Sequence, residues 1–242
     1  MTDTADGRFS LVKTTLLDFP GKVAAAVFLP GCNLRCPFCQ NPDLVLPDLI
    51  KSTDVLTEDI NSFSAFLDKR ARLLGGVVFS GGEALLNPLL PNLIDLVRKH
   101  NLKVKLDTAG LLPEKLKVLA ENGKIDYAAV DLKTLPDKYT ELGWKKNGKN
   151  NAENLLKKTL SILKENNIDF EVRTTVVPPL VTEEILEKLI PLASMAPRWI
   201  WQPYNRGNTI NPDWSDINNA PGEDELRKTA ESFPADIPVI IR

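Results

Sequence analysis

The stretch VAAAVFLPGCNLRCPFC, residues 23–39, joins a purely apolar run to a group of cysteines. The run at 23–29 carries β-branched and aromatic residues, which is typical of a strand buried on both faces. The cysteines follow at once as Cys32, Cys36 and Cys39, with the spacing CxxxCxxC. A regular strand cannot aim three thiols at that spacing toward one ligand. The segment therefore predicts a strand followed by a loop that wraps around a bound group.

The rest of the chain alternates short apolar runs with longer amphipathic stretches. Further strands are predicted at 77–79, 103–106, 127–130, 170–177, 199–202 and 239–241. Helices are predicted at 57–73, 88–100, 113–122, 151–166, 182–192 and 224–232. This alternation predicts βαβ units with parallel strands and right-handed crossovers. Six or seven such units fit a partial (β/α)6-type TIM barrel, with the cysteine loop after its first strand, better than a small doubly wound sheet.

The length of 242 residues predicts a single domain over 1–242. Within it, 1–20 is expected to be an irregular lead-in, and 205–242 a closing loop, helix and tail. The segments 134–150 and 205–223 are expected to be long surface loops, which often face partners or act as lids.

Composition excludes several classes of function. The chain has 30 Lys and Arg against 32 Asp and Glu, a net charge of −2, so it lacks the basic excess of a nucleic-acid binder. No apolar run approaches the ~20 residues of a membrane helix, and the polar start does not resemble a signal peptide. These features predict a cytoplasmic protein without nucleic-acid or membrane partners. His100 is the single histidine, so a Ser–His–Asp triad would have to use it.

Polar side chains follow each predicted strand where it ends. In parallel α/β folds, the chemistry gathers at the carboxyl ends of the strands. We therefore expect these segments to converge on one face: 32–39, 80–83, 107–110, 131–133, Arg173 and 202–205.

The three cysteines have several interpretations. Their odd number and close spacing argue against a disulfide framework. Structural zinc requires four protein ligands, and the chain has no fourth thiol. Buried inert cysteines at this spacing would be a coincidence. Three thiolates suit a [4Fe–4S] cluster whose fourth iron stays open to a chelating small molecule.

CNLRCPFC after an apolar strand, with SGGE (80–83) after the next strand, resembles the radical S-adenosylmethionine superfamily. The resemblance implies that Cys32, Cys36 and Cys39 hold a [4Fe–4S] cluster. It implies that the open iron binds the amino and carboxylate groups of S-adenosylmethionine. One electron from the cluster would then cleave the sulfonium into methionine and a 5′-deoxyadenosyl radical.

Further motifs narrow the resemblance to the glycyl-radical-enzyme activases. These are LDFPGK (17–22), FLPGCNLRCPFCQNP (28–42), DT (107–108), DLK (131–133), and the segments 202–208 and 211–212. The chain looks most similar to the activating proteins of anaerobic ribonucleoside-triphosphate reductases. This implies an oxidoreductase that makes a glycyl radical on a large partner enzyme, with a flavodoxin- or ferredoxin-type electron donor. Gln40, Ala109 and Asn205 depart from the pattern of the pyruvate formate-lyase activases, two of them where that pattern has histidine.

The resemblance also implies a set of S-adenosylmethionine contacts. They are Phe38, Gly81, Gly82, Glu83, Asp107, Asp131, Leu132, Lys133, Arg173 and Asn205. Asp107, Thr108 and Asp131 would hold a monovalent cation. No catalytic residue is expected beyond the cluster and S-adenosylmethionine themselves. Each assignment has a structural alternative: a core aromatic for Phe38, a tight turn for the glycines, a capping acid for Glu83, Asp107 and Asp131, and an ion pair for Arg173. His100 is expected at a surface helix end.

Two rival functions remain at this point. One is a radical enzyme that acts on a small biosynthetic molecule, for example of the deazaguanine type. The other is a non-catalytic iron–sulfur sensor.

Overall fold

The computed structural model describes residues 7–146, 151–234 and 236–242. The chain divides into two compact units, which are described separately. Unit 1 comprises residues 1–33, 41–108 and 114–128. Unit 2 comprises residues 34–40, 109–113 and 129–242.

Unit 1 is built on the strands β1 (Ser10–Thr15), β2 (Ala24–Leu29), β3 (Gly76–Gly81) and β4 (Lys103–Thr108), with the first two residues of β5 (Tyr127–Asp131) beside β4. β1 runs antiparallel to β2, whereas β2–β3 and β3–β4 are parallel. The β2–β3 register pairs Ala24 with Gly76 and Leu29 with Gly81. Both strands end level, so the segments that follow them start side by side.

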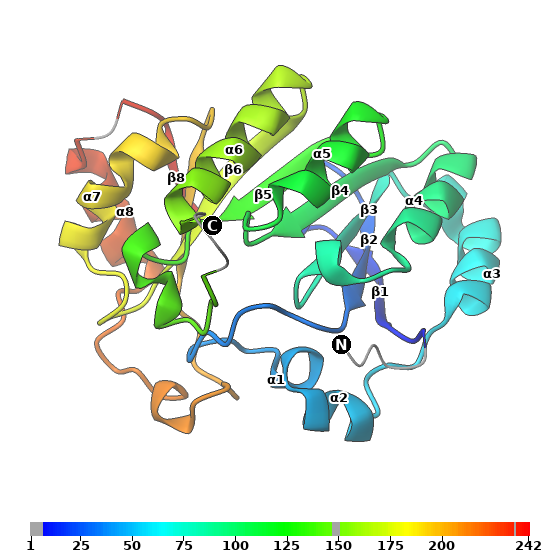
Figure 1. Cartoon of the computed structure of the whole chain (residues 1–242), viewed down its shortest axis with the longest axis horizontal. Helices are drawn as coiled ribbons and strands as arrows, with labels where there is room; N and C mark the ends of the chain where they lie inside the picture. Colours follow the sequence, from blue (N-terminus) through cyan, green and yellow to red (C-terminus); the bar gives the residue numbers. More distant parts are fainter. Residues whose placement is uncertain (1–6, 147–150, 235) are drawn as a thin grey trace. The chain divides into compact units, whose positions relative to one another are not determined.

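The helices of unit 1 are α1 (Pro42–Val45), α2 (Pro47–Ser52), α3 (Ile60–Arg70), α4 (Leu90–Lys99) and most of α5 (Pro113–Glu121). α4 buries Leu90, Leu93, Ile94 and Val97, whose spacing places them on one face. That face packs on β3 and β4, and α3 lies next to α4 (Figure 1). Asp59 begins α3 through a reciprocal capping box with Ser62.

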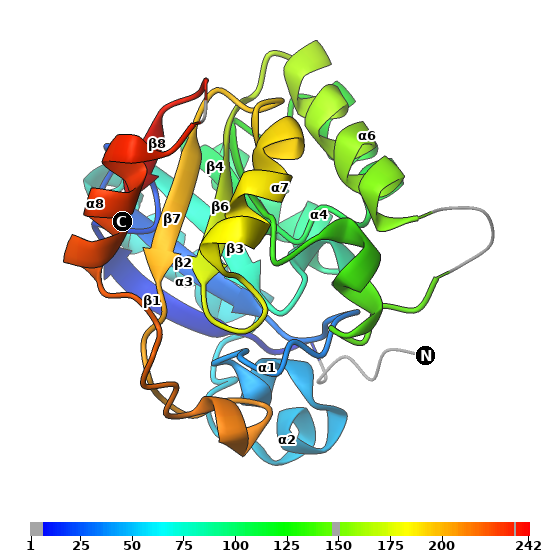
Figure 2. The same cartoon turned by 90° about the vertical axis from the view of Figure 1, so that its left-hand side faces the viewer.

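Unit 2 carries the remainder of β5 and the strands β6 (Asp169–Val176), β7 (Trp199–Pro203) and β8 (Val239–Ile241), in that order. The β6–β7 and β7–β8 pairs are parallel. The helices are α6 (Ala152–Glu165), α7 (Glu183–Ala193) and α8 (Glu223–Ser232). α8 lies along β7 and β8 (Figure 2), where Phe233 contacts the buried rings of Trp199 and Trp201.

The alternation of strands and helices confirms the predicted α/β class with largely parallel strands. Among the described strands, β1 borders only β2 and β8 borders only β7, so the strand order is open, as a partial barrel requires. The predicted segments from 57 to 241 all form the expected element type, with ends that differ by a few residues. No helix among the described residues is long and apolar enough to cross a membrane.

Several segments differ from expectation. The lead-in is not irregular throughout, because Ser10–Thr15 forms β1. α1 and α2 occupy a region for which no element is predicted. The two expected loops contain short 3-10 turns, at Pro136–Thr140 and Pro212–Trp214. Residues 1–6 of the lead-in and 147–150 of the first loop lie outside the described residues.

Candidate active site

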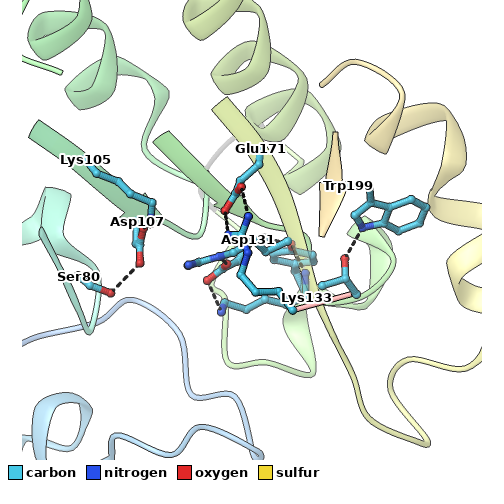
Figure 3. A network of polar contacts seen from close by, with 11 residues as sticks. Ser80, Lys105, Asp107, Asp131, Lys133, Glu171 and Trp199 are labelled. Atoms are coloured by element: carbon cyan, nitrogen blue, oxygen red, sulfur yellow. Dashed lines mark hydrogen bonds and ion pairs between the residues drawn. The ribbon is translucent and has the colours of Figure 1, made fainter. Parts of the chain in front are cut away.

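In unit 1, two acidic groups at the strand ends are held by neighbouring side chains. Asp107, near the end of β4, accepts a hydrogen bond from the hydroxyl of Ser80 at 3.2 Å and pairs with the ammonium of Lys105 (Figure 3). Lys105 is only 1% exposed, so this ion pair keeps a buried cation neutralised. The Thr108 hydroxyl lies 3.0 Å from both carboxylate oxygens of the buried Glu83. Thr108 and Glu83 therefore bond to each other.

The glycines after β3 allow two backbone segments to meet. Gly82 N–H donates to the carbonyl of Leu29 at 2.9 Å, and Glu83 N–H donates to that of Gly31 at 2.8 Å. A Cβ on Gly82 would lie 2.2 Å from the Gly31 oxygen, so only glycine fits there. The segment that Gly82 approaches within unit 1 is the one just before Cys32.

In unit 2, the cysteine loop has a defined path. Cys36 is buried and Cys39 half-buried, and Cys39 N–H donates to the Cys36 carbonyl at 3.0 Å. Arg35 N–H donates to the carbonyl of Leu142 at 2.6 Å, which ties the loop to the segment after β5. Cys32, Cys36 and Cys39 form no disulfide.

Asp131, at the end of β5, lies between two cations. Its carboxylate accepts from Arg173 Nε at 2.9 Å and from Lys133 Nζ at 3.2 Å. Figure 3 shows Lys133 reaching back to Asp131. Burial alone would raise the pKa of Asp131, but the charges of Arg173 and Lys133 outweigh it and lower the pKa to about 2. Asp131 is therefore a carboxylate at any ordinary pH.

Lys133 lies in the field of the cysteine loop. Burial would lower its pKa, but the negative charges of Asp131, Cys36 and Cys39 raise the pKa above the ordinary lysine value. Its backbone N–H donates to the hydroxyl of Tyr139 at 3.2 Å. Burial raises the pKa of that hydroxyl, and this effect is larger than the lowering by the hydrogen bond and the charge of Lys133. Tyr139 is therefore a neutral phenol. Lys133 is therefore a cation whose charge interacts with Cys36 and Cys39 of unit 2.

The chain after β7 covers the cysteine loop of unit 2. Ile210 N–H donates to the Cys39 carbonyl at 3.1 Å, and Asn211 N–H donates to the Pro37 carbonyl at 3.0 Å. The Gln40 amide donates to the main-chain carbonyl of Asn205. Asn205 itself is exposed.

The sequence-predicted site residues fall into two groups. Unit 1 holds Cys32, Gly81, Gly82, Glu83, Asp107 and Thr108, whereas unit 2 holds Cys36, Phe38, Cys39, Asp131, Leu132, Lys133, Arg173 and Asn205. Leu132 is fully buried, and its N–H donates to the carbonyl of Arg173 at 2.8 Å. Glu83 caps the short 3-10 turn Ala84–Leu86, because its carboxylate accepts from Leu85 N–H at 3.2 Å. His100 lies at the end of α4, as predicted, 3.4 Å from Asp68.

Sequence reasoning missed several polar residues. Lys105 and Tyr139 were not assigned, although each contacts a residue that was. Glu171, which is 0% exposed, binds the guanidinium of Arg242 through two contacts of 2.8 and 3.2 Å. Glu171 could have been recognised from the sequence as a charged residue within a largely apolar strand. Such a residue needs a buried partner of opposite charge.

The cysteine side chains have the donor chemistry that an iron–sulfur cluster requires. Among the described residues, no three His, Cys, Asp or Glu side chains already form a metal-binding group. The thiols themselves fit, because there are three of them, none is in a disulfide, and the positive charge of Lys133 interacts favourably with two of them. A set of three thiolates matches a cluster that leaves one iron open.

Comparisons with known proteins agree with this chemistry. Residues 26–192 match the model of the radical SAM superfamily. A Methanocaldococcus jannaschii protein, provisionally named a glycyl-radical enzyme activating enzyme, is 30% identical over 219 residues, covering 90% of this chain and 88% of that protein. The pyruvate formate-lyase-activating enzyme of Clostridium pasteurianum is 35% identical over 104 residues, 42% of either chain.

Solved structures share the fold. A radical SAM methyltransferase from Sphaerobacter thermophilus superposes with a TM-score of 0.64 and 16% identity, covering 93% of this chain and 67% of that one. SuiB from Streptococcus suis gives a TM-score of 0.63 with 16% identity, covering 88% of this chain and 47% of that one. The predicted fold class is thereby confirmed.

Proposed function

We propose, because this chain belongs to the radical SAM superfamily, that it is a radical SAM enzyme which activates a glycyl radical enzyme. The similarity to the M. jannaschii protein carries this proposal, since it extends over 219 residues and is not confined to the cysteine motif. The shorter match to a pyruvate formate-lyase-activating enzyme supports the same reaction class.

The protein's cofactors in this proposal are a [4Fe–4S] cluster on Cys32, Cys36 and Cys39, and S-adenosylmethionine on the open iron. When bound, they supply a 5′-deoxyadenosyl radical, made by one-electron cleavage of the sulfonium, which takes a hydrogen atom from a glycine Cα of the partner. No general base is needed for hydrogen-atom transfer. This agrees with a chain whose single histidine lies at the end of α4.

The residues of this chain bind and orient S-adenosylmethionine. Lys133 and Arg173 provide positive charge for its carboxylate, and Asp131 holds both cations in place through contacts of 3.2 and 2.9 Å. The backbone at Gly81 and Gly82 meets the methionine amine, and Phe38 lies against the adenine. Glu83, Asp107, Leu132 and Asn205 complete the proposed contact set.

A monovalent cation between Asp107, Thr108 and Asp131 remains part of the proposal. It would offset the repulsion between these carboxylates and that of the cofactor. Calorimetry of S-adenosylmethionine binding across potassium and sodium salts tests it. Asp107→Ala and Asp131→Ala should each weaken binding and reduce its dependence on the cation. Unchanged affinity in both variants would return these acids to a structural role.

The cysteine assignment is tested by Cys32→Ala, Cys36→Ala and Cys39→Ala. Each should lose bound iron after anaerobic reconstitution and lose turnover. Each should keep its far-UV circular dichroism spectrum, because apolar burial supplies most of the folding free energy. A variant that retains both full iron content and full turnover would remove that cysteine from the ligand set.

The partner proposed on motif resemblance is an anaerobic ribonucleoside-triphosphate reductase, with a flavodoxin- or ferredoxin-type electron donor. The test mixes reduced, reconstituted protein with the candidate reductase and S-adenosylmethionine without oxygen. Electron paramagnetic resonance should show a glycyl radical on the reductase, and the signal should vanish when its target glycine is changed to alanine. Turnover of a small metabolite without any such signal would favour the biosynthetic rival, and absence of cofactor cleavage would favour a sensor.

A further inference from the structure

Residues 204–216, which follow β7 and are called the strap below, form a closed segment in unit 2. The Tyr204 hydroxyl donates to the main-chain carbonyl of Trp214, and Gly207 N–H donates to that of Ser215 at 3.1 Å. Near the tip, the Thr209 hydroxyl donates to the carbonyl of Asn211 at 2.7 Å. These bonds make the strap a structured unit, although most of its residues are outside helices and strands.

The strap holds the cysteine loop by its main chain. The carbonyls of Pro37 and Cys39 both accept from strap N–H groups, at 3.0 and 3.1 Å. These carbonyls belong to the 37–38 and 39–40 peptide groups, which flank Phe38 and Cys39. Fixing their planes fixes the direction in which the side chains of Phe38 and Cys39 leave the backbone, because each Cβ is set by the dihedrals around it.

Two side-chain contacts complete the attachment. Gln40, the residue after the last cysteine, donates its amide to the carbonyl of Asn205 at the start of the strap. Phe38 and Trp214 lie with ring centroids 6.1 Å apart at 43°, within the range of favourable aromatic pairs. The second half of the cysteine loop is therefore attached to the strap at two places, near the start of the strap at Asn205 and near its end at Trp214.

We propose that the strap is a positioning element for the cluster, with Gln40 and Tyr204 as positioning residues. Gln40 pins the loop to the strap, and Tyr204 keeps the strap closed so that its N–H groups stay on Pro37 and Cys39. The strap thereby holds the thiols of unit 2 in their ligating directions and slows cluster loss. This inference rests on the proposed function only in taking these cysteines as cluster ligands.

The test measures release of iron to a chelator from the reconstituted protein alone, without a partner enzyme. Gln40→Ala and Tyr204→Phe should each release iron roughly two- to tenfold faster than the native protein, the effect of one lost hydrogen bond. Gln40→His keeps an N–H donor and should restore slow release. Asn218→Ala, which removes an exposed amide just beyond the strap, is the matched control and should behave as the native protein.

A second measurement does not need the cluster. In the protein without iron, alkylation of Cys39 by iodoacetamide, followed by mass spectrometry, should accelerate in Gln40→Ala and Tyr204→Phe but not in Asn218→Ala. Native rates of both iron release and alkylation in the two variants would overturn the positioning role. If the native protein binds no cluster at all, the proposed function fails, and the alkylation rates still decide the role of the strap.

Should Gln40→Ala fail to fold, as judged by circular dichroism, Tyr204→Phe decides alone, since it removes a single oxygen atom. Spectra of the reduced cluster separate positioning from general stability. A changed electron paramagnetic resonance line shape in variants with native melting temperatures supports positioning. An unchanged line shape together with unchanged iron release contradicts it.

Discussion

Asp131 connects two cations of unit 2, Arg173 and Lys133. Its two oxygens are used separately, one by Arg173 and one by Lys133. Removing its charge leaves two half-buried cations without their anion, which is more costly than losing an exposed pair. Asp131 therefore matters for folding as well as for the proposed cofactor site.

We predict that Asp131→Asn lowers the free energy of unfolding by about 2 kcal/mol at pH 7. This is the free energy that corresponds to lowering the carboxyl pKa from 3.8 to about 2. The folded-state pKa lies below the unfolded value of 3.8, so the contribution is fully present above pH 3.8. It is lost as the pH falls through about 2. Urea unfolding of both proteins at several pH values measures the difference.

Asp169→Asn is the control for that experiment, because Asp169 pairs with Arg198 at the surface, where its side chain is 57% exposed. It should change the unfolding free energy little at any pH. A difference for Asp131→Asn that stays constant from pH 7 to pH 3 would show that its carboxylate is not stabilised by the two cations.

Residues close in sequence were the predictable part of the site. Cys36 and Cys39 lie in one short loop, and Asp131 and Lys133 lie in one motif, so their proximity follows from the chain itself. The bonds of Thr108 to Glu83 and of Arg242 to Glu171 join strands or ends far apart in sequence. Lys105 is hidden for a different reason: its partner Asp107 is only two residues away on β4, but a lysine in a strand is normally exposed, so the sequence does not indicate that this pair is buried.

Among the elements, α6 begins at a side-chain cap. Asn151 caps it by accepting from Asn154 N–H at 2.8 Å, and its backbone is extended, as a capping position requires. The helix then buries one face that includes Leu156, Leu160 and Leu163. The cap thus fixes where this face begins.

Asn151→Ala is expected to lower the free energy of unfolding by about 1 kcal/mol, because one helix N–H loses its acceptor. Thermal and urea denaturation measure the change. Asn151→Asp keeps a capping oxygen and should retain native stability. Equal loss in both variants would mean that the amide, and not the capping oxygen, is what stabilises α6.

The elements that were not predicted are short or exposed. β1 has Val12, Lys13 and Thr14 exposed, so its sequence lacks the buried alternation that identifies a strand. α1 and α2 span four and six residues, less than two turns, so no helical periodicity develops. Longer segments such as α4 and β6 can be predicted, because they have enough residues to show a pattern of apolar and polar positions.

At the scale of the whole molecule, charge offers little long-range steering. The net charge is −2, and acidic and basic residues are almost equal in number. Recognition of a partner enzyme should then depend on shape and short-range contacts more than on a charged field.

We predict that the rate of partner activation changes less than about threefold between about 50 and 300 mM salt, since screening acts mainly on long-range charge attraction. Initial rates of glycyl-radical formation at several salt concentrations give the answer, with cofactor cleavage in the absence of partner as the reference. A tenfold fall in the partner-dependent rate alone would reveal a charged docking surface.

The contact between Gly82 and Gly31 has a consequence for how this sequence can vary. If every residue were replaced by all others and the folded variants were selected, position 82 should return glycine alone, since any side chain would overlap the Gly31 oxygen. Gly222, with open space around it and an extended backbone at the start of α8, should instead accept serine or aspartate and gain a helix cap. Mutational tolerance would then mark where this backbone leaves no room for a side chain, without any assay of its chemistry.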